Sequence, residues 1–276
     1  MKFKQLGVRV LVAVVGIPAI LFLVLWGREP FALLIATIIC LSQFELYQMT
    51  ESKHVSPKKI VGLLIGIILP ATFYYKGVKL FWVVLLAGII VILLIELFRN
   101  RKEPLLNAAT TIFGLIYPAS LFSFMILIRE LPRELNQDYP RGAHWILAML
   151  VSVWICDTAA YFIGSWIGRH KLFERVSPNK TVEGAVAGFI FALLTGYLIH
   201  LILFKDTSLV HLMVIAAIGG SIGQLGDLVE SLFKRDVGIK DSSSILPGHG
   251  GILDRFDSLF LAAPVVYVYL WIVFVY

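Results

Sequence analysis

Long apolar runs alternate with short polar segments from one end of the chain to the other. Each run is 16 to 26 residues long, and about 20 apolar residues in a helix are enough to cross the hydrocarbon core of a bilayer. We therefore predict an all-α polytopic membrane protein with nine transmembrane helices. They are expected at residues 8–27, 30–49, 60–75, 80–98, 107–128, 144–167, 183–204, 208–233 and 253–275.

Composition agrees with this interpretation. The chain of 276 residues is 59% hydrophobic and 15% charged, whereas soluble domains are roughly 45–50% apolar and about 25% charged. Little chain remains for a separate soluble domain, so we predict one integral membrane domain over residues 1–276. Within it, residues 1–130 are expected to form structural, lipid-facing helices, and residues 144–276 the catalytic helices and loops. The first apolar run has no small-residue cleavage site and is expected to be retained.

The distribution of basic residues predicts an orientation. With a cytoplasmic N-terminus, 17 of the 24 Lys and Arg residues fall in cytoplasmic segments, as the positive-inside rule requires. The C-terminus is then extracytoplasmic. Two polar loops, 168–182 and 234–252, together with Arg255 supply much of this bias, and without these residues it is only nine to seven. Residues 129–144 are expected to form an extracytoplasmic loop in which prolines break the helices.

Charged residues within the apolar runs are concentrated in the second half of the chain. A charge inside a membrane span is costly, so it normally faces a partner, a cavity or an ion. The first half holds chiefly Glu45 and Glu96, and we therefore place any chemistry in the second half. The acids there are Asp157, Glu183, Asp227, Glu230, Asp254 and Asp257.

Two pairs of these acids share one spacing. Asp227 and Glu230 are three residues apart, as are Asp254 and Asp257, so each pair lies on one helix face. Both pairs are expected at the cytoplasmic ends of neighbouring antiparallel helices, where converging carboxylates would require cations. Oxygen ligands favour Mg²⁺ or Mn²⁺. The alternative is that the acids cap helices or pair with Arg235 and Arg255.

The two polar loops have the composition of anion-binding segments. Residues 234–251, KRDVGIKDSSSILPGHGG, mix Lys, Ser and Gly, and such loops let backbone N–H groups approach phosphate oxygens. The alternative is a flexible basic loop attracted to anionic lipid headgroups. In the other loop, residues 177–181 lead into an apolar run, so Lys180 would lie at a helix N-terminus. Thr181 or Asn179 could equally be only an N-cap.

One segment of the second half and three shorter flanking motifs resemble those of a known family. SLFKRDVGIKDSSSILPGHGGILDRFD, residues 231–257, resembles the signature of the phosphatidate cytidylyltransferases, or CDP-diacylglycerol synthases. Residues 157–161, 177–184 and 226–231 look like its flanking motifs, so the resemblance covers about residues 150–260. It implies an enzyme of phospholipid biosynthesis in the bacterial cytoplasmic (inner) membrane, with its active site facing the cytoplasm. Such an enzyme condenses CTP with phosphatidic acid, giving CDP-diacylglycerol and pyrophosphate with Mg²⁺ or Mn²⁺.

The resemblance, taken with the chemistry above, yields a set of candidate residues. Asp227 and Asp254 would hold the metal. Asp257 would either be a further ligand or contact the ligands without touching the metal. His249 would organise its loop or donate to a phosphate. Catalytic roles are expected for Asp227, Asp254, Asp257, Lys180, Lys240 and His249. Substrate binding is expected for Ser177, Asn179, Lys180, Thr181, Lys234, Arg235, Lys240, Asp241, Ser243, Gly250, Gly251 and Arg255.

The expected partners are CTP, phosphatidic acid and the bilayer, with no nucleic acid. A monovalent cation is a further candidate cofactor, and helix packing through small residues permits a homodimer. Three other functions compete with this one: the same chemistry on an ether-lipid phosphate, an ion-coupled transporter, and a lipid-binding scaffold. Transporter sites lie near the bilayer midplane, often in inverted repeats, and a scaffold would not need four carboxylates at this spacing.

Overall fold

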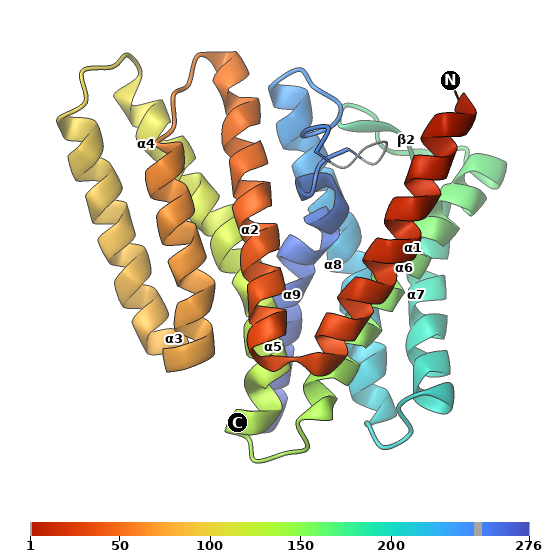
Figure 1. Ribbon diagram of the computed structural model, residues 1–276. Helices are drawn as coiled ribbons and strands as arrows, with labels where there is room; N and C mark the ends of the chain where they lie inside the picture. The colour runs from red at the N-terminus through yellow and green to blue at the C-terminus, as the bar shows by residue number, and fades with distance from the viewer. Residues whose placement is uncertain (1, 246–249, 276) are drawn as a thin grey trace. The chain divides into compact units, whose positions relative to one another are not determined.

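The computed structural model describes residues 2–245 and 250–275, with side chains from residue 12 onward. The described chain is almost entirely helical (Figure 1). A short hairpin of two antiparallel strands, β1 (Lys171–Phe173) and β2 (Ser177–Thr181), precedes α7. The α-helices are α1 (Lys2–Trp26), α2 (Arg28–Thr50), α3 (Lys59–Leu97), α4 (Pro104–Gly114), α5 (Leu121–Glu134), α6 (Pro140–Ile167), α7 (Val182–Ile202), α8 (Leu209–Asp236) and α9 (Leu253–Val275). A π-helical segment, η2 (Leu115–Ser120), joins α4 to α5, so that residues 104–134 form one continuous span.

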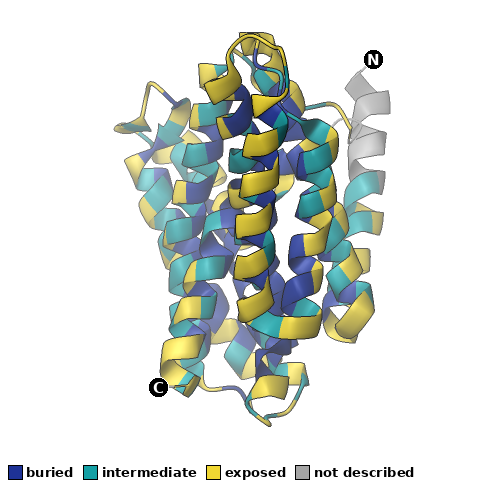
Figure 2. Ribbon diagram, turned by 90° about the vertical axis from the view of Figure 1, so that its left-hand side faces the viewer, coloured by how far each residue is buried: buried dark blue, intermediate teal, exposed yellow. Residues whose placement is uncertain are grey.

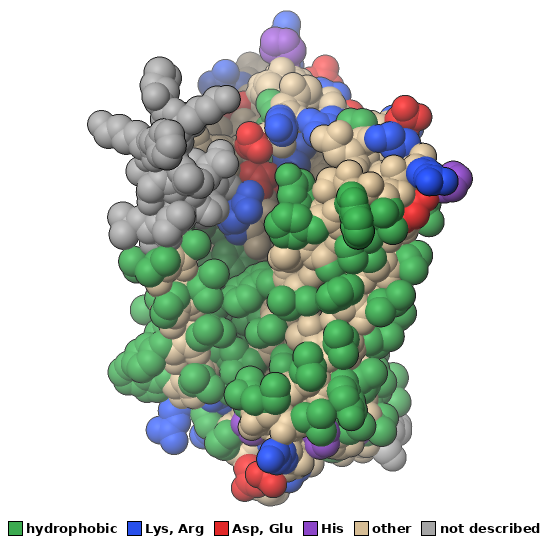
Figure 3. Space-filling view, turned by 90° about the vertical axis from the view of Figure 1, so that its right-hand side faces the viewer, with side chains coloured by type: hydrophobic (Ala, Val, Ile, Leu, Met, Phe, Trp, Pro, Cys, Tyr) green, Lys and Arg blue, Asp and Glu red, His purple; other side chains and the backbone are tan. Residues whose placement is uncertain are grey.

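Helix length and composition identify an integral membrane protein. In the described chain, seven helices are long and apolar enough to cross a membrane, and Val12–Trp26 is a shorter apolar helix. Exposed positions run along the outward faces of the helices and are not confined to their ends (Figure 2). Many of these positions carry large hydrophobic side chains. On the face that carries α7, hydrophobic side chains form a broad band, with charged side chains at either end (Figure 3).

The count of seven differs from the predicted nine partly because α3 covers two predicted runs, 60–75 and 80–98. Gly77 interrupts its 39 residues with φ 67° and ψ −166°, a region open essentially only to glycine. The chain reverses there, so α3 is a hairpin of two helical limbs (Figure 1). Phe73 and Phe81 stack across the turn with ring centroids 4.1 Å apart.

Replacing Gly77 by Ala is expected to lower the free energy of unfolding by about 1–3 kcal/mol, because a Cβ is strained in this backbone conformation whatever space surrounds it. Denaturant titration in detergent measures the change. Gly16→Ala is the matched control: Gly16 lies in α1 at an ordinary φ with no atom within 4 Å of the added Cβ. Equal stability of the two variants would show that the turn accommodates a side chain.

The expectation for residues 129–144 is wrong in extent. Helix α5 continues to Glu134 with Pro132 inside it, and α6 already begins at Pro140, because proline is well suited to the first turn of a helix. Arg129 is only 1% exposed. Its guanidinium donates to the carbonyl of Tyr139 at 3.0 Å and lies 4.0 Å from that ring's centroid. A residue that we had counted in a loop is therefore buried.

Backbone contacts divide the chain into two compact units. The first comprises residues 1–127 and 236–256, and the second comprises residues 128–235 and 257–276. This grouping differs from the predicted division into residues 1–130 and 144–276. The segment 236–256, which we had assigned to the catalytic half, packs with the N-terminal helices, because its polar groups find their partners there. The second unit contains most of the other candidate residues.

Candidate functional site

In the second unit, α8 and α9 approach most closely beside two of the predicted acids. A Cβ on Gly226 would lie 2.8 Å from the carbonyl oxygen of Asp257 and 3.1 Å from Cα of Ser258, so the two backbones touch at this glycine. Asp227 follows Gly226 directly. The structure thus brings Asp227 close enough to Asp257 for their charges to interact; the expected convergence of both pairs of acids, with Asp254 beside Asp227, stays a prediction.

The carboxylate of Asp227 has a partner on each oxygen. Its Oδ2 lies 2.7 Å from Nζ of Lys180, and its Oδ1 accepts a hydrogen bond from the hydroxyl of Ser231 at 3.2 Å. The side chains of Lys180 and Asp227 remain 30% and 26% exposed. A ligand can therefore reach both charges while Ser231 holds the carboxylate in place.

Asp257 lies in a negatively charged environment. Its Oδ1 accepts the backbone N–H of Ser258 at 2.6 Å. Asp227 exerts the largest charge repulsion on it and Asp157 the next, whereas Lys234 acts in the opposite sense. Carboxylates on α8 and α6 thus both act on the charge of Asp257. The role of Asp157 in the reaction stays open.

The β-hairpin positions Lys180 immediately before α7. Thr181 is the N-cap of that helix, and its hydroxyl accepts the backbone N–H of Gly184 at 3.2 Å, as one alternative predicted. Lys171 donates to the carbonyl of Pro178 at 2.6 Å across the two strands. Ser177 and Asn179 lie in β2, where Ser177 is half-buried and Asn179 is exposed; their contacts with substrate stay predictions, as does that of Thr181.

Two predicted cations on α8 are engaged within the second unit. Lys234 forms an ion pair with Glu230 one turn earlier, and these side chains are only 10% and 0% exposed. Glu230 thus has a cationic partner, Lys234, on its own helix. Arg235 donates from Nε to the carbonyl of Val176 at 3.2 Å, which ties the end of α8 to the hairpin. Binding of phosphate by Lys234 and Arg235 stays a prediction.

In the first unit, Asp254 organises the predicted phosphate-binding loop. Its Oδ2 accepts the backbone N–H groups of Ser242 and Gly251 at 2.9 and 2.8 Å, and it lies 3.0 Å from the Ser242 hydroxyl. Gly250, whose φ is 81°, adopts a conformation that favours glycine. These contacts give Asp254 a structural task that the sequence did not reveal. Its role as a metal ligand stays a prediction.

The remaining candidates differ in how far the structure describes them. Lys240, Asp241 and Arg255 are exposed and form no ion pair within residues 2–245 and 250–275. Ser243 donates its hydroxyl to Glu45 at 2.6 Å. His249 lies outside the described residues.

Glu45 is the residue that sequence reasoning missed. It is fully buried on α2 and accepts hydrogen bonds from the same loop. The available signal was a single carboxylate within an apolar run, which by default suggests a functional site. The concentration of acids in the second half of the chain nevertheless predicts the chemistry there, and Glu45 falls outside that prediction.

The donor chemistry of the second unit suits a hard divalent cation. Mg²⁺ is usually held by one or two carboxylates, with substrate phosphates and water completing its shell. Asp227 and Asp257 supply such a pair. In the part of the chain that the structure describes, no three His, Cys, Asp or Glu side chains form a ready metal-binding group. An ion held by Asp227 and Asp257 would need further oxygen ligands, such as substrate phosphates and water.

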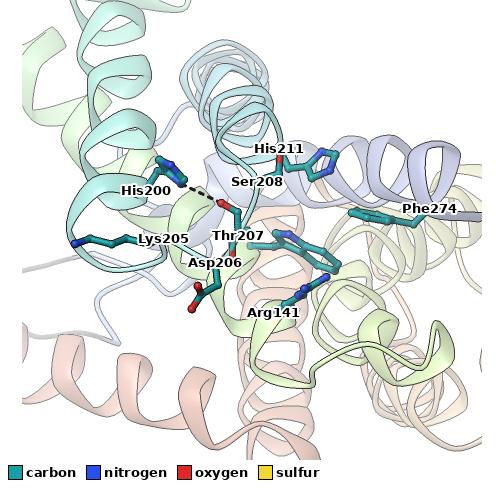
Figure 4. A pocket seen from close by; sticks show the side chains of 9 residues that line it. Arg141, His200, Lys205, Asp206, Thr207, Ser208, His211 and Phe274 are labelled. Carbon is teal, nitrogen blue, oxygen red and sulfur yellow. Dashed lines mark hydrogen bonds between the residues drawn. The ribbon is translucent and has the colours of Figure 1, made fainter.

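A cavity of about 360 Å³ lies elsewhere in the second unit (Figure 4). It is lined by Arg141, Trp145, His200, Lys205, Asp206, Thr207, Ser208, His211 and Phe274. Ser208 precedes the start of α8, whereas Asp227 lies 19 residues further on, about 28 Å away at 1.5 Å per helical residue. The cavity therefore contains none of the candidate acids and is separate from the site.

Comparison with known proteins places this chain among nucleotide-transferring enzymes. The model of a family described as the cytidylyltransferase family matches residues 7–273. A phosphatidate cytidylyltransferase of Bacillus subtilis (strain 168) is 35% identical over 264 residues, covering 94% of this chain and 95% of the relative. Enzymes of the same name from Staphylococcus saprophyticus and Synechocystis sp. are 35% and 32% identical, covering 95% of this chain and 98% and 95% of theirs.

Proposed function

This chain belongs to the cytidylyltransferase family, and we propose that it transfers the cytidylyl group of CTP to phosphatidic acid, giving CDP-diacylglycerol and pyrophosphate. It is a nucleotidyltransferase. The names of its relatives support phosphatidic acid as the acceptor. The structural observation that carries the proposal is the Lys180–Asp227 pair beside Asp257. This partly exposed charged group joins the β-hairpin to α8 and α9, which are long enough to cross a membrane.

The proposed reaction brings two anions together. A phosphate oxygen of phosphatidic acid attacks the α-phosphorus of CTP, a new P–O bond forms, and the bond to the β-phosphate oxygen breaks to release pyrophosphate. A phosphomonoester has its second pKa near about 6, so the nucleophile is already ionised at neutral pH and needs no strong base. The protein must chiefly neutralise charge and align the reactants.

The residues of the second unit suit this task. We assign Lys180 to neutralising phosphate charge, because its ammonium is fixed by the hairpin and by Asp227 yet remains accessible. Asp227 and Asp257 would hold Mg²⁺ or Mn²⁺, with Asp254 as the third predicted ligand. When bound, such an ion would neutralise phosphate oxygens and stabilise the leaving pyrophosphate. Lys240 and Arg255, both exposed, are the further candidates for binding phosphates.

We also propose that the site faces the cytoplasm in the bacterial cytoplasmic membrane, with the N-terminus inside and the C-terminus outside. The support is the placement of 17 of the 24 basic residues in segments that this orientation makes cytoplasmic. CTP is a cytoplasmic nucleotide, and a site at the headgroup level lets the lipid phosphate meet it without crossing the bilayer.

A direct assay tests the proposed function. Purified protein in detergent is given labelled CTP, Mg²⁺ and phosphatidic acid, and the products are separated into lipid and water-soluble fractions. We expect labelled CDP-lipid and pyrophosphate in equal amounts, and no product with diacylglycerol. A parallel reaction with an ether-linked lipid phosphate tests the competing acceptor. Release of CMP without a labelled lipid would contradict the proposal.

Asp254→Asn separates the two roles open to that residue. If Asp254 is a ligand as well as a loop acceptor, activity falls and the Mg²⁺ concentration needed for half-maximal activity rises by about tenfold or more, as is typical when a metal's surroundings are altered. We expect this result in a Mg²⁺ titration of the variant and the unmodified protein. A loss of activity that is identical at every Mg²⁺ concentration would restrict Asp254 to holding the loop.

A further inference from the structure

Glu45 is a buried carboxylate whose charge is satisfied by hydrogen bonds. Its exposure is 0%, and it takes part in no ion pair among the residues that the structure describes. Glu96, the other notable acid of the first half, instead lies 3.4 Å from the guanidinium of Arg99 and accepts from Asn107 at 2.9 Å. A buried carboxylate is tolerated only when it is paired or fully hydrogen-bonded, so the donors around Glu45 decide its role.

Each oxygen of Glu45 faces one backbone N–H and one hydroxyl. Oε1 accepts from the N–H of Ile252 at 2.9 Å and the hydroxyl of Ser243 at 2.6 Å. Oε2 accepts from the N–H of Leu253 at 2.7 Å and lies 3.1 Å from the hydroxyl of Ser242. Because α9 begins at Leu253, the carboxylate also lies at a helix N-terminus, where a negative charge is favoured.

These donors come from two places along the connection between α8 and α9. Ser242 and Ser243 lie near the middle of the loop 237–252, Ile252 is its last residue, and Leu253 begins α9. Ser242 also contacts Asp254 through both its N–H and its hydroxyl. Two carboxylates, one from α2 and one from the first turn of α9, therefore hold the middle of the loop against its C-terminal end.

The space between Gly251 and the side chains of Glu45 and Ser242 is tightly packed. A Cβ on Gly251 would overlap the hydroxyl of Ser242 and lie 2.5 Å from Oε2 of Glu45, so only glycine fits beside the carboxylate. Near the start of the loop, Lys53 of the segment after α2 forms an ion pair with Asp236 at 3.0 Å. The loop is thus attached at several points to the α2 region, in the half of the chain to which the sequence had assigned no chemistry.

We infer that Glu45 is a positioning residue for the transfer reaction: from α2 it holds residues 242–243 and 251–253 in the conformation that presents Lys240, Asp241 and Gly250 to phosphates. This inference rests on the proposed function. It assigns to the N-terminal helices a part in catalysis that does not require them to touch substrate. The proposed chemical contribution is alignment, because a reactant displaced by about 1 Å can cost as much as a hundredfold in rate.

Glu45→Gln is the decisive variant. Glutamine has nearly the same shape, but only one of its two terminal atoms accepts hydrogen bonds. Because each oxygen of Glu45 accepts a backbone N–H, either orientation of the amide sets its NH₂ group against Ile252 or Leu253. We expect kcat/KM for CTP to fall about tenfold to a hundredfold. Glu45→Asp keeps two accepting oxygens on a shorter side chain, and we expect it to recover part of the loss.

Gln43→Leu is the matched control for structural damage. Gln43 is also fully buried on α2, but its amide donates to the Tyr47 hydroxyl at 2.9 Å and to the carbonyl of Gly62 at 3.0 Å, away from the loop. We expect this variant to lower thermal stability without changing kcat/KM. If Gln43→Leu reduces kcat/KM as much as Glu45→Gln does at equal stability, the role of Glu45 is structural and the inference fails.

Amide hydrogen exchange supplies a measurement that does not depend on turnover. In Glu45→Gln, the amides of residues 242–243 and 251–253 are expected to exchange faster, while those of α3 stay protected. Unchanged exchange in this loop would overturn the inference, whatever the kinetics. An inactive unmodified protein would instead overturn the proposed function, and the inference with it, even if the exchange result held. An active protein with an unaffected Glu45→Gln variant would overturn only the role of Glu45.

Discussion

Asp227→Asn is expected to reduce the transferase activity on the order of a thousandfold. Asp227 meets Lys180 on one oxygen and Ser231 on the other, and it is the strongest charged neighbour of Asp257. Its amide analogue keeps the shape but loses the negative charge. If Asp227 holds the divalent ion, the variant loses several kcal/mol of stabilisation of the transition state, and each 1.36 kcal/mol corresponds to about tenfold in rate. Initial rates of CDP-lipid formation at saturating CTP measure the effect.

The control for this variant is Asp138→Asn. Asp138 lies in the connection between α5 and α6, is 84% exposed and is 4.0 Å from Arg141, so its charge should contribute little to folding or rate. Both variants are expected to retain the thermal stability of the unmodified protein within a few degrees. An Asp227→Asn variant with more than about a tenth of the original rate would remove Asp227 from the predicted metal ligands.

Lys180→Ala is expected to cost about a hundredfold or more in kcat/KM for CTP, the size of effect seen when one fixed electrostatic donor is removed from an active site. The KM for CTP should rise, because the ammonium is proposed to neutralise nucleotide phosphates. Lys180→Arg keeps the charge and should recover part of the activity. Kinetics over a range of CTP concentrations, with melting in detergent as a check on folding, measure both effects.

The double variant Lys180→Ala with Asp227→Asn separates catalysis from simple charge balance. Both side chains are partly exposed, and such a pair usually contributes only about 0–1 kcal/mol to stability. If Lys180 served only to balance Asp227, removing both charges would restore activity relative to Lys180→Ala. We expect no recovery, because each residue has its own task in the proposed reaction. Recovery to near the original rate would refute the direct role of Lys180.

Several elements could be predicted from local pattern alone. The run 253–275 was expected as one span, and α9 covers Leu253–Val275. The start of α7 and the capping role open to Thr181 followed from a polar residue before an apolar run. The spacing of Asp227 and Glu230 placed both on one helix face. These predictions succeed because helices satisfy their backbone hydrogen bonds locally, and an apolar run in lipid has few alternatives.

Other features depended on contacts that sequence spacing does not encode. The pairing of Lys234 with Glu230, one turn away on its own helix, was not predicted; binding of phosphate by Lys234 stays a prediction. Arg129 was counted in a loop, yet it is buried against Tyr139. Both side chains, Lys234 and Arg129, could have met several partners. The rotation of α8 about its axis and the residue at which α5 ends determined which partner each one meets.

The sequence by itself determined that this chain is an apolar, helical membrane protein, and it carried the motifs by which the family can be identified. It did so because hydrophobic length and residue spacing act along the chain. Only the tertiary structure decided that Gly226 lets Asp227 lie beside Asp257, that Lys180 reaches the same carboxylate, and that Glu45 holds a loop about 200 residues away in the sequence. These contacts depend on how helices that are far apart in the sequence pack together. The sequence around a single buried charge therefore does not identify its partner.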